Sequence, residues 1–399
     1  MGLLKIIFSL LILSFPIAEI GRFQFPNGVA FSVNDVFLAA LIIFWGVYHL
    51  LNKNKIKKDI LTKPILVFIS VAFISLVLNI PHLSASNFLV SLLYLLRWAM
   101  YVSLYFIVRE FDKKFRNKIP YLMLFSGMIV VIAGFAQYFF YPSLRNLYYL
   151  GWDEHLYRMF SSFLDPNFAG TFFVIFFIFI LGLIYKYIKE GLINKAVSLS
   201  ILNIFVLIAV YLTYSRSALV MLVISVSVFL FLIKKWKLIV FALAGLLLIV
   251  FILPKSFQTE GTNFLRTFSS GQRIESSQIA LKIFSSSPVF GVGFNAYRYA
   301  QNKLGLNNQV WETTHSGAGT DNSFLFVLAT SGIFGLVSYL YLIYKIFTLT
   351  KINTDNNAFS LMLFASLSGL IFNSFFINSL FYVFILEWIW ITASLTENK

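Results

Sequence analysis

The stretch NFAGTFFVIFFIFILGLIYKYI, residues 167–188, decides the fold class of this chain. As an α-helix it is about 33 Å long, which matches the roughly 30 Å hydrocarbon core of a bilayer. Its one charged side chain, Lys186, lies close to the end of the run, where a long side chain can reach water. The stretch therefore predicts a transmembrane helix.

The composition extends this prediction to the whole chain. Of its 399 residues, 59% are hydrophobic and 12% are charged, whereas a soluble domain has about 25% charged residues. Such a chain cannot cover its own surface with polar groups, so lipid has to be its main solvent. The absence of cysteine excludes disulfides, thiolate metal sites and a cysteine nucleophile, and no P-loop or dinucleotide-binding motif is present.

Apolar runs of membrane-spanning length recur from end to end. The first run follows Lys5 and resembles a signal peptide, but FPIAE (15–19) is a poor cleavage site, so we interpret it as a helix. We therefore predict an all-α integral membrane protein with about 12 transmembrane helices. The runs lie at 3–20, 33–51, 64–80, 88–108, 120–141, 167–188, 196–213, 217–233, 237–253, 322–347, 358–377 and 379–395.

Lysine and arginine alternate between the two sides of this pattern. With a cytoplasmic N-terminus, eighteen fall in cytoplasmic loops and four in short outer loops, as the positive-inside rule requires. The net charge of +15 therefore reports topology and argues against a nucleic-acid partner, and both termini are predicted to be cytoplasmic. The cytoplasmic set is Lys53, Lys55, Lys57, Lys58, Lys63, Arg109, Lys113, Lys114, Arg116, Lys118, Lys186, Lys189, Lys195, Lys234, Lys235, Lys237, Lys345 and Lys351, and the outer set is Arg22, Arg145, Arg158 and Arg216.

One long outer loop divides the chain. Residues 254–321 have no continuous apolar span, and they separate nine predicted helices in 1–253 from three in 322–399, which end in a short cytoplasmic tail. Long loops translocate largely regardless of charge, so the cations of this loop do not contradict the orientation.

The outer loop is predicted to be partly helical. Ser269 or Ser270 can cap a helix that runs to about Phe284, with Ile274, Leu281 and Phe284 on one side, and such a helix suits the membrane surface. The sequence SPVFGVG (287–293) predicts a turn, and a second short helix is expected near 295–303.

Two arginines lie where no polar loop explains them. Arg216 occupies TYSRSA (213–218) between two spans, and Arg97 lies midway along the run 88–108. An ionisable group at membrane depth is a functional hypothesis by default, and a guanidinium matches phosphate oxygens in bidentate fashion. The alternatives are snorkelling of Arg216 to the head groups and structural pairing of Arg97 with a carboxylate or a carbonyl.

Two further outer segments carry polar residues at helix boundaries. RMFSSFLDPNFAG (158–170) contributes a third cation, Arg158, and an Asp-Pro-Asn helix start, in which Asp165 or Asn167 is alternatively a simple cap. TTHSGAGTDNS (313–323) ends the long loop, and His315 or Asp321 in it can act as a general base.

The alternatives for this second segment are an N-cap role for Asp321 and a solvated position for His315. The chain's histidines, at 49, 82, 155 and 315, do not cluster, and the outer carboxylates lack ligand spacing, so no metal site is predicted.

Together these segments resemble the O-antigen ligase / O-antigen polymerase family of bacterial membrane glycosyltransferases. The resemblance covers most of the chain and is strongest over 158–345. Residues 158–167 are similar to the family's Arg…Phe-x-x-Pro-Asn segment, and YSRS (214–217) to its Ser-Arg turn. Arg273 with 287–293 resembles its Arg…Pro-Leu-Phe-Gly-x-Gly stretch, and DNS (321–323) through GIFG (332–335) resembles its membrane re-entry element.

One departure from the family concerns the base. Many members carry His-Asn where this chain has Asp321-Asn322. The role of base therefore falls to His315, our first choice, to Asp321, or to neither.

The resemblance implies a reaction. A glycan on undecaprenyl diphosphate is transferred, with inversion and without metal or soluble cofactor, to an acceptor hydroxyl at the outer face of the bacterial inner membrane. The acceptor is another lipid-linked glycan, a lipid A core or a protein. Implied residues are Arg216, Arg273, Arg158 and Arg97 for the diphosphate, His315 and Asp321 for catalysis, and Asn167, Asn322 and Arg298 for the acceptor or structural support.

A transporter is the alternative from another class, namely a lipid-linked oligosaccharide flippase or another protein with 12 helices. It predicts internal pseudo-symmetry, and the sequence shows no inverted repeat.

Overall fold

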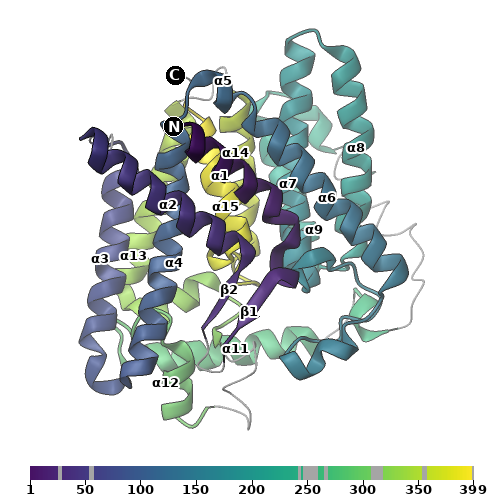
Figure 1. The fold of residues 1–399 in the computed structure, drawn as a ribbon. Coiled ribbons are helices and arrows are strands. Elements are labelled where there is room, and N and C mark those ends of the chain that lie inside the picture. The colour runs from purple at the N-terminus through teal and green to yellow at the C-terminus, as the bar shows by residue number, and fades with distance from the viewer. Residues whose placement is uncertain are drawn as a thin grey trace.

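The computed structural model shows one bundle of helices with almost no sheet (Figure 1). It describes residues 1–25, 29–53, 58–240, 244–245, 259–264, 268–306, 318–352 and 357–397. Both termini lie at one end of the bundle, which we call the terminal face (Figure 1). The opposite end, the loop face, carries α11 (Phe268–Ser286) and α12 (Tyr297–Lys303).

The predicted spans recur as helices. Among the described residues, seven helical segments are long and apolar enough to cross a membrane, and four shorter apolar helices accompany them. The long segments are α1 (Gly2–Ser14) with η1 (Phe15–Gly21), α2 (Val33–Asn52), α4 (Ala85–Arg109), α5 (Lys113–Arg116) with α6 (Ile119–Phe140), α7 (Pro166–Lys189), α8 (Ile193–Leu212) and α13 (Ser323–Ile352). The shorter ones are α3 (Thr62–Leu78), α9 (Arg216–Leu232), α14 (Ala358–Asn373) and α15 (Val383–Leu395).

These segments coincide with every predicted run except the ninth. Most of that run, 237–253, lies outside the described residues, so the total of about 12 helices stays a prediction. Two short strands, β1 (Arg22–Gln24) and β2 (Ala30–Ser32), pair antiparallel between the first two helices.

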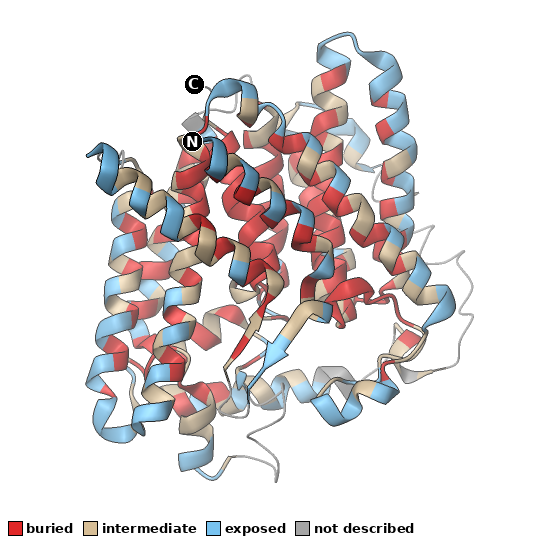
Figure 2. Ribbon diagram, in the orientation of Figure 1, coloured by how far each residue is buried: buried red, intermediate tan, exposed pale blue. Residues whose placement is uncertain are grey.

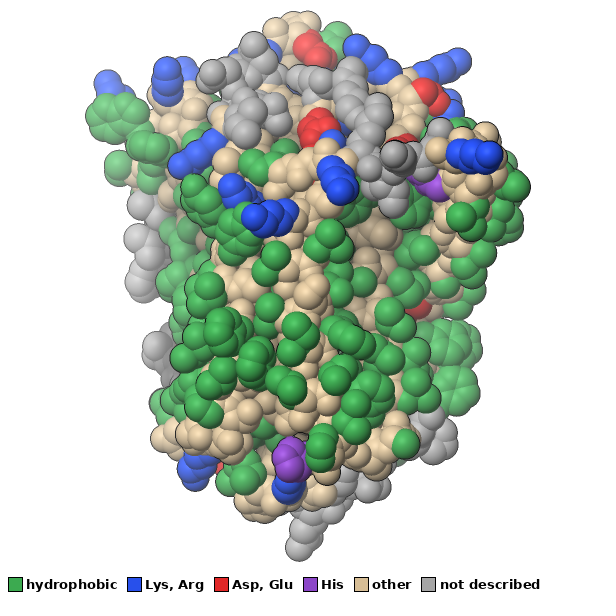
Figure 3. Space-filling view, turned by 90° about the vertical axis from the view of Figure 1, so that its left-hand side faces the viewer, with side chains coloured by type: hydrophobic (Ala, Val, Ile, Leu, Met, Phe, Trp, Pro, Cys, Tyr) green, Lys and Arg blue, Asp and Glu red, His purple; other side chains and the backbone are tan. Residues whose placement is uncertain are grey.

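The surface of the bundle is apolar where lipid would surround it. On α6, Phe125 and Ile132 are more than half exposed, whereas Val130 and Val131 of the same helix are buried. Figure 2 shows the buried residues along the inward sides of the helices. On the side drawn in Figure 3, hydrophobic side chains cover the middle, and Lys and Arg gather toward the terminal face. Exposed apolar area on this scale is expected of a multi-pass membrane protein.

Aromatic packing around α7 forms the centre of the core. Phe172, Phe176 and Phe179 of α7 lie on one helical stripe, and their rings are 5.1, 5.7 and 5.4 Å from the ring of Trp388 on α15. Edge-to-face contacts of this kind add to the burial of apolar area. They place α7, and with it the start of that helix at the loop face, in a fixed position.

α13 is broken at Gly332, where φ is 67°. A helix interrupted there leaves the carbonyls of Ala329 and Thr330 without partners in the next turn. The backbone NH groups of Val292 and Gly293 donate to these two carbonyls at 3.1 and 3.0 Å. The predicted turn at 287–293 therefore inserts into the break and satisfies the two unpaired carbonyls.

Two glycines, Gly291 and Gly332, make this insertion possible. A Cβ on Gly332 would lie 2.2 Å from Val289 O. A Cβ on Gly291, where φ is 72°, would lie 2.3 Å from the carbonyl carbon of Thr330. α3 also binds both the break and the inserted turn. Ser75 Oγ donates to Thr330 O at 2.9 Å, and Asn79 Nδ2 donates to Gly291 O at 2.9 Å. The loop that follows α11 is thus anchored to the bundle.

Candidate functional site

Arg158 joins two of the motif segments at the loop face. Its side chain is buried, its Nε donates to Thr213 O at 2.9 Å, and its Nη2 donates to Asn167 Oδ1 at 3.2 Å. Ser215 Oγ donates to the same Oδ1 at 3.1 Å. The start of α7 and the turn between α8 and α9 are therefore locked together, and Asn167 has the contacts of a structural support.

The start of α7 is capped by its acidic residue. Asp165 Oδ1 accepts from the NH groups of Asn167 and Phe168, at 2.6 and 3.2 Å. This is the alternative role that the sequence left open for Asp165. Its other oxygen lies 3.8 Å from His155 Nε2, which comes from the loop before Arg158.

Arg216 is the first residue of α9. The chain turns sharply before it, with φ of 49° at Tyr214, and only three residues, 213–215, connect α8 to α9. The side chain is half-buried, and its Nη1 lies 3.5 Å from Phe264 O in the outer loop. Arg216 thus points toward the segment that leads into α11.

Arg273 lies on the inner side of α11, which we define as Arg273, Ser276, Ala280 and Ile283. Ala280 and Ile283 are buried, and the spacing of the four residues places them on one helical face. Burial lowers the pKa of Arg273, the negative charge of Asp321 opposes this, and the positive charge of Arg216 adds to it. The charges of Arg216 and Asp321 therefore both act on the Arg273 guanidinium group.

Two residues of the expected apolar side, Ile274 and Leu281, face away from the bundle, and the third, Phe284, is half-buried. Ile274 and Leu281 are exposed, at 62% and 49%, whereas Ala280 and Ile283 are buried against α12 and α13. The pattern of large apolar residues marked the side that faces away from the bundle. Under the predicted topology that side faces the membrane surface.

Asp321 lies opposite Arg273. Ser276 ties the two segments together, because Asp321 N donates to Ser276 Oγ at 3.3 Å and Ser276 Oγ donates to Thr320 Oγ1 at 3.0 Å. The Asp321 side chain is accessible to water, but protein atoms surround it on most sides. This burial raises its pKa, the charge of Arg273 opposes the shift, and the charge of Asp165 adds to it.

The N-cap of α13 is Asn322. Its Oδ1 accepts from Phe324 N at 2.9 Å and Leu325 N at 3.0 Å. The alternative in which Asp321 caps this helix is therefore wrong, and the Asp321 carboxylate is available for another role. His315 lies outside the described residues.

Arg97 is held by a carboxylate from α2. Its Nε and Nη2 donate to the two oxygens of Asp35 at 2.8 and 2.5 Å, and Tyr101 Oη donates to Asp35 at 3.0 Å. Structural pairing was one of the two roles expected for Arg97, and this geometry favours it over direct contact with a diphosphate. Sequence reasoning missed Asp35, although an acidic residue at the start of a predicted span was a signal for it.

Arg298 on α12 is set apart from the Arg216–Arg273 pair. Burial lowers its pKa, nearby Tyr299 and Tyr94 oppose the shift, and Arg22 adds to it. Its surroundings are therefore β1 and α4, on a different part of the loop face.

The loop face thus brings two cations and one carboxylate together. Arg216, Arg273 and Asp321 come from α9, α11 and the segment before α13, which are far apart in sequence. Two guanidinium groups whose charges act on each other favour an anionic ligand, and a carboxylate in the same field can accept a proton. In the part of the chain that is described, no three His, Asp or Glu side chains group as metal ligands do.

Comparison with known proteins finds a family match, and it covers this region. Residues 201–340 match the family model described as O-antigen ligase. The matched segment contains Arg216, Arg273, Asp321 and the break in α13 at Gly332, so the resemblance inferred from the sequence is confirmed over residues 201–340. No curated protein matches the chain.

Proposed function

We propose that this chain transfers a glycan from undecaprenyl diphosphate to an acceptor hydroxyl at its loop face. The observation that carries the proposal is the shared environment of Arg216 and Arg273 inside the segment that matches the O-antigen ligase family. Two cations brought together repel each other, and a diphosphate bridging them would remove that cost.

The two arginines act on the leaving group. As the acceptor oxygen forms a bond to the anomeric carbon, the bond from that carbon to the diphosphate oxygen breaks, and negative charge grows on the diphosphate. Fixed guanidinium groups stabilise this charge in the place that a metal ion takes in many glycosyltransferases. Attack from the side opposite the leaving group inverts the anomeric configuration.

The proton of the acceptor hydroxyl needs a base. Asp321 is suited to this role because its carboxylate lies beside Arg273 and its raised pKa makes it a stronger base than an ordinary aspartate. His315, six residues earlier, is the other candidate. Arg158 and Asn167 then position the α8–α9 turn, and Arg97 supports the bundle through Asp35.

The membrane topology fits this assignment. The loop face would be the outer side of the bacterial inner membrane, where flipped lipid-linked glycans are presented, and the terminal face would be cytoplasmic. The acceptor is another lipid-linked glycan in a polymerase, or a lipid A core or protein in a ligase.

The test uses cells whose long surface glycan depends on this gene. Arg216→Gln and Arg273→Gln are each expected to reduce glycan transfer by about a hundredfold, the usual effect of removing one preorganised donor. Arg145→Gln is the matched control, since Arg145 is an exposed arginine of an outer loop. Normal glycan length in both site variants, at wild-type abundance, would contradict the proposal.

A vesicle assay separates the remaining alternatives. Lipid-linked glycan alone, converted to longer products, indicates a polymerase, whereas a requirement for a lipid A core or a protein indicates a ligase. Movement of the lipid-linked glycan across the membrane without transfer would favour the flippase.

A further inference from the structure

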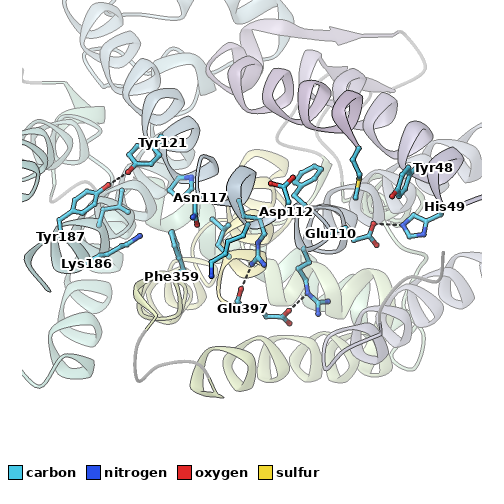
Figure 4. Close-up of a pocket in the computed structure, with 18 residues that line it drawn as sticks. Tyr48, His49, Glu110, Asp112, Asn117, Tyr121, Lys186, Tyr187, Phe359 and Glu397 are labelled. Carbon is cyan, nitrogen blue, oxygen red and sulfur yellow. Dashed lines mark hydrogen bonds and ion pairs between the residues drawn. The ribbon is translucent and has the colours of Figure 1, made fainter. Parts of the chain in front are cut away.

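A large cavity opens at the terminal face, at the opposite end of the bundle from the proposed donor site. Its volume is about 870 Å³, within the range of small-molecule sites. Residues from the ends of α2, α4 and α7, from α5 and from the C-terminal segment line it (Figure 4). Nothing in the proposed glycan transfer uses it.

The carboxylates of this cavity are already paired. Glu110 Oε2 lies 2.8 Å from His49 Nε2 and accepts from Trp45 Nε1 at 2.9 Å. Asp112 pairs with Lys5, and Glu397 accepts from Arg109 Nε at 2.8 Å. Asp112 and Glu397 are therefore each paired with a cation, and Glu110 is held by two ring nitrogens.

Three cations on the lining have weaker partners. Arg116 is buried, and its Nη2 donates to two neutral carbonyls, Ser394 O at 2.8 Å and Glu397 O at 2.7 Å. Lys186 lies 3.9 Å from Glu190, with both side chains over 40% exposed, so water screens the pair. Lys113 is exposed and has no salt bridge within the described ranges. Four Lys and Arg side chains line the cavity against three carboxylates, so the formal charge of the lining is positive.

The rest of the lining is amphipathic. Leu183, Phe359 and Leu395 provide apolar surface, and Tyr187 Oη donates to Tyr121 Oη at 3.2 Å on one wall (Figure 4). The cavity lies where α4 ends and α6 begins, which is the depth of lipid head groups if these helices span the membrane. Its chemistry suits a molecule with an anionic head and apolar tails.

We infer that this cavity binds the phosphodiester head group of an anionic phospholipid from the leaflet on the terminal side. Lys113, Lys186 and Arg116 contact the phosphate, and the apolar wall receives the upper acyl chains. Basic pockets between helices at this depth are a known way to hold acidic lipids.

The experiment measures lipid binding to the full-length protein in detergent by native mass spectrometry. Phosphatidylglycerol is compared with phosphatidylcholine, and with soluble glycerol 3-phosphate and inorganic phosphate. Phosphatidylglycerol is expected to bind at least tenfold more tightly than each of the others. Equal binding of the two lipids would overturn the inference, and tighter binding of a soluble phosphate would overturn the lipid as the source.

Charge-neutral variants locate the site. Lys113→Gln and Lys186→Gln are each expected to weaken phosphatidylglycerol binding about fivefold, and the double variant about thirtyfold. The control pair is Lys235→Gln with Lys237→Gln, two exposed lysines after α9 that do not line the cavity. An equal loss in the control pair would show diffuse attraction to surface lysines and overturn the assignment.

Arg116 is tested with a check on folding, because it also bonds to the C-terminal backbone. Arg116→Lys keeps the charge and Arg116→Gln removes it. Weaker lipid binding in the Gln variant than in the Lys variant, with equal thermal unfolding in the absence of added lipid, supports the direct contact. Equal lipid binding by these two variants, with equal unfolding, would overturn it.

Discussion

Replacing Gly291 by alanine tests the joint between the outer loop and the broken helix. The added Cβ would lie 2.3 Å from the Thr330 carbonyl carbon and 2.4 Å from Ser331 N, both backbone atoms that cannot rotate away. The turn has to withdraw from the break in α13. Its hydrogen bonds from Val292 and Gly293 are then lost or lengthened.

The size of the effect follows from three contributions. A left-handed φ costs an alanine roughly 1–2 kcal/mol, and the two hydrogen bonds contribute about 1 kcal/mol each. The loss of glycine's freedom in the unfolded chain offsets about 0.4–1 kcal/mol. Gly291→Ala should therefore lower the free energy of unfolding by roughly 3 kcal/mol.

Gly191 supplies a matched control. It has the same φ of 72°, in the turn between α7 and α8, but a Cβ there would meet no atom within 4 Å. Gly191→Ala should pay for the dihedral angle alone and lose about 0.5–1 kcal/mol. The difference between the variants, roughly 2 kcal/mol, isolates the contact.

The assay is reversible unfolding in mixed micelles of SDS and a non-ionic detergent, followed by helical circular dichroism. Limited proteolysis of the outer loop provides a second readout, because a released turn exposes the residues after α11. If the two alanine variants unfold within about 0.5 kcal/mol of each other, the close fit of this turn contributes nothing to stability and the reasoning fails.

Three further predictions concern charged and polar groups. Asp35→Ala leaves Arg97 without its buried partner and should lower the free energy of unfolding by about 3 kcal/mol in the same micelle titration. The double variant with Arg97→Leu should recover part of the lost stability. No recovery would show that the unpaired Arg97 charge does not cause the loss. The raised pKa of Asp321 means that the folded state favours the protonated carboxyl group. Its contribution to stability is therefore present below about pH 3.9 and is lost as pH rises through the folded pKa. Asp321→Asn should remove this pH dependence of the unfolding free energy, and an unchanged dependence on pH would contradict the prediction. Asn167→Ala removes an acceptor with two donors and should cost roughly 1–3 kcal/mol of unfolding free energy, whereas Asn194→Ala, at an exposed position, should cost less than 0.5 kcal/mol.

The transmembrane spans were predictable because a helix in a bilayer needs about 20 consecutive apolar residues. The run 167–188 agrees with α7, Pro166–Lys189, to within a residue at each end, since the apolar stretch and its Asp165 cap are both local in sequence. The pairing of Arg97 with Asp35 was not predictable in this way. It depends on which helices are neighbours, and lipid-facing and core-facing runs are equally apolar.

The outer loop shows a second limit of the same kind. The helix and an apolar side suited to the membrane surface were expected, but the side that packs on the bundle was not identified. That side carries the small residues Ser276 and Ala280, whereas Ile274 and Leu281 point away from the bundle. A hydrophobic pattern records affinity for any apolar phase and does not distinguish the core from the membrane.

The four arginines expected to bind diphosphate divide by the charge that faces them. Arg97 is neutralised by a bidentate carboxylate, and Arg158 donates to a carbonyl and an amide that position two motif segments. Burial lowers the pKa of Arg273, the negative charge of Asp321 opposes this shift, and the positive charge of Arg216 adds to it. Arg97 and Arg158 therefore have roles in holding helices together, whereas an anion that reached both Arg216 and Arg273 would offset the repulsion between their charges. This difference is why we assign the diphosphate to the pair on α9 and α11 and a positioning role to the other two.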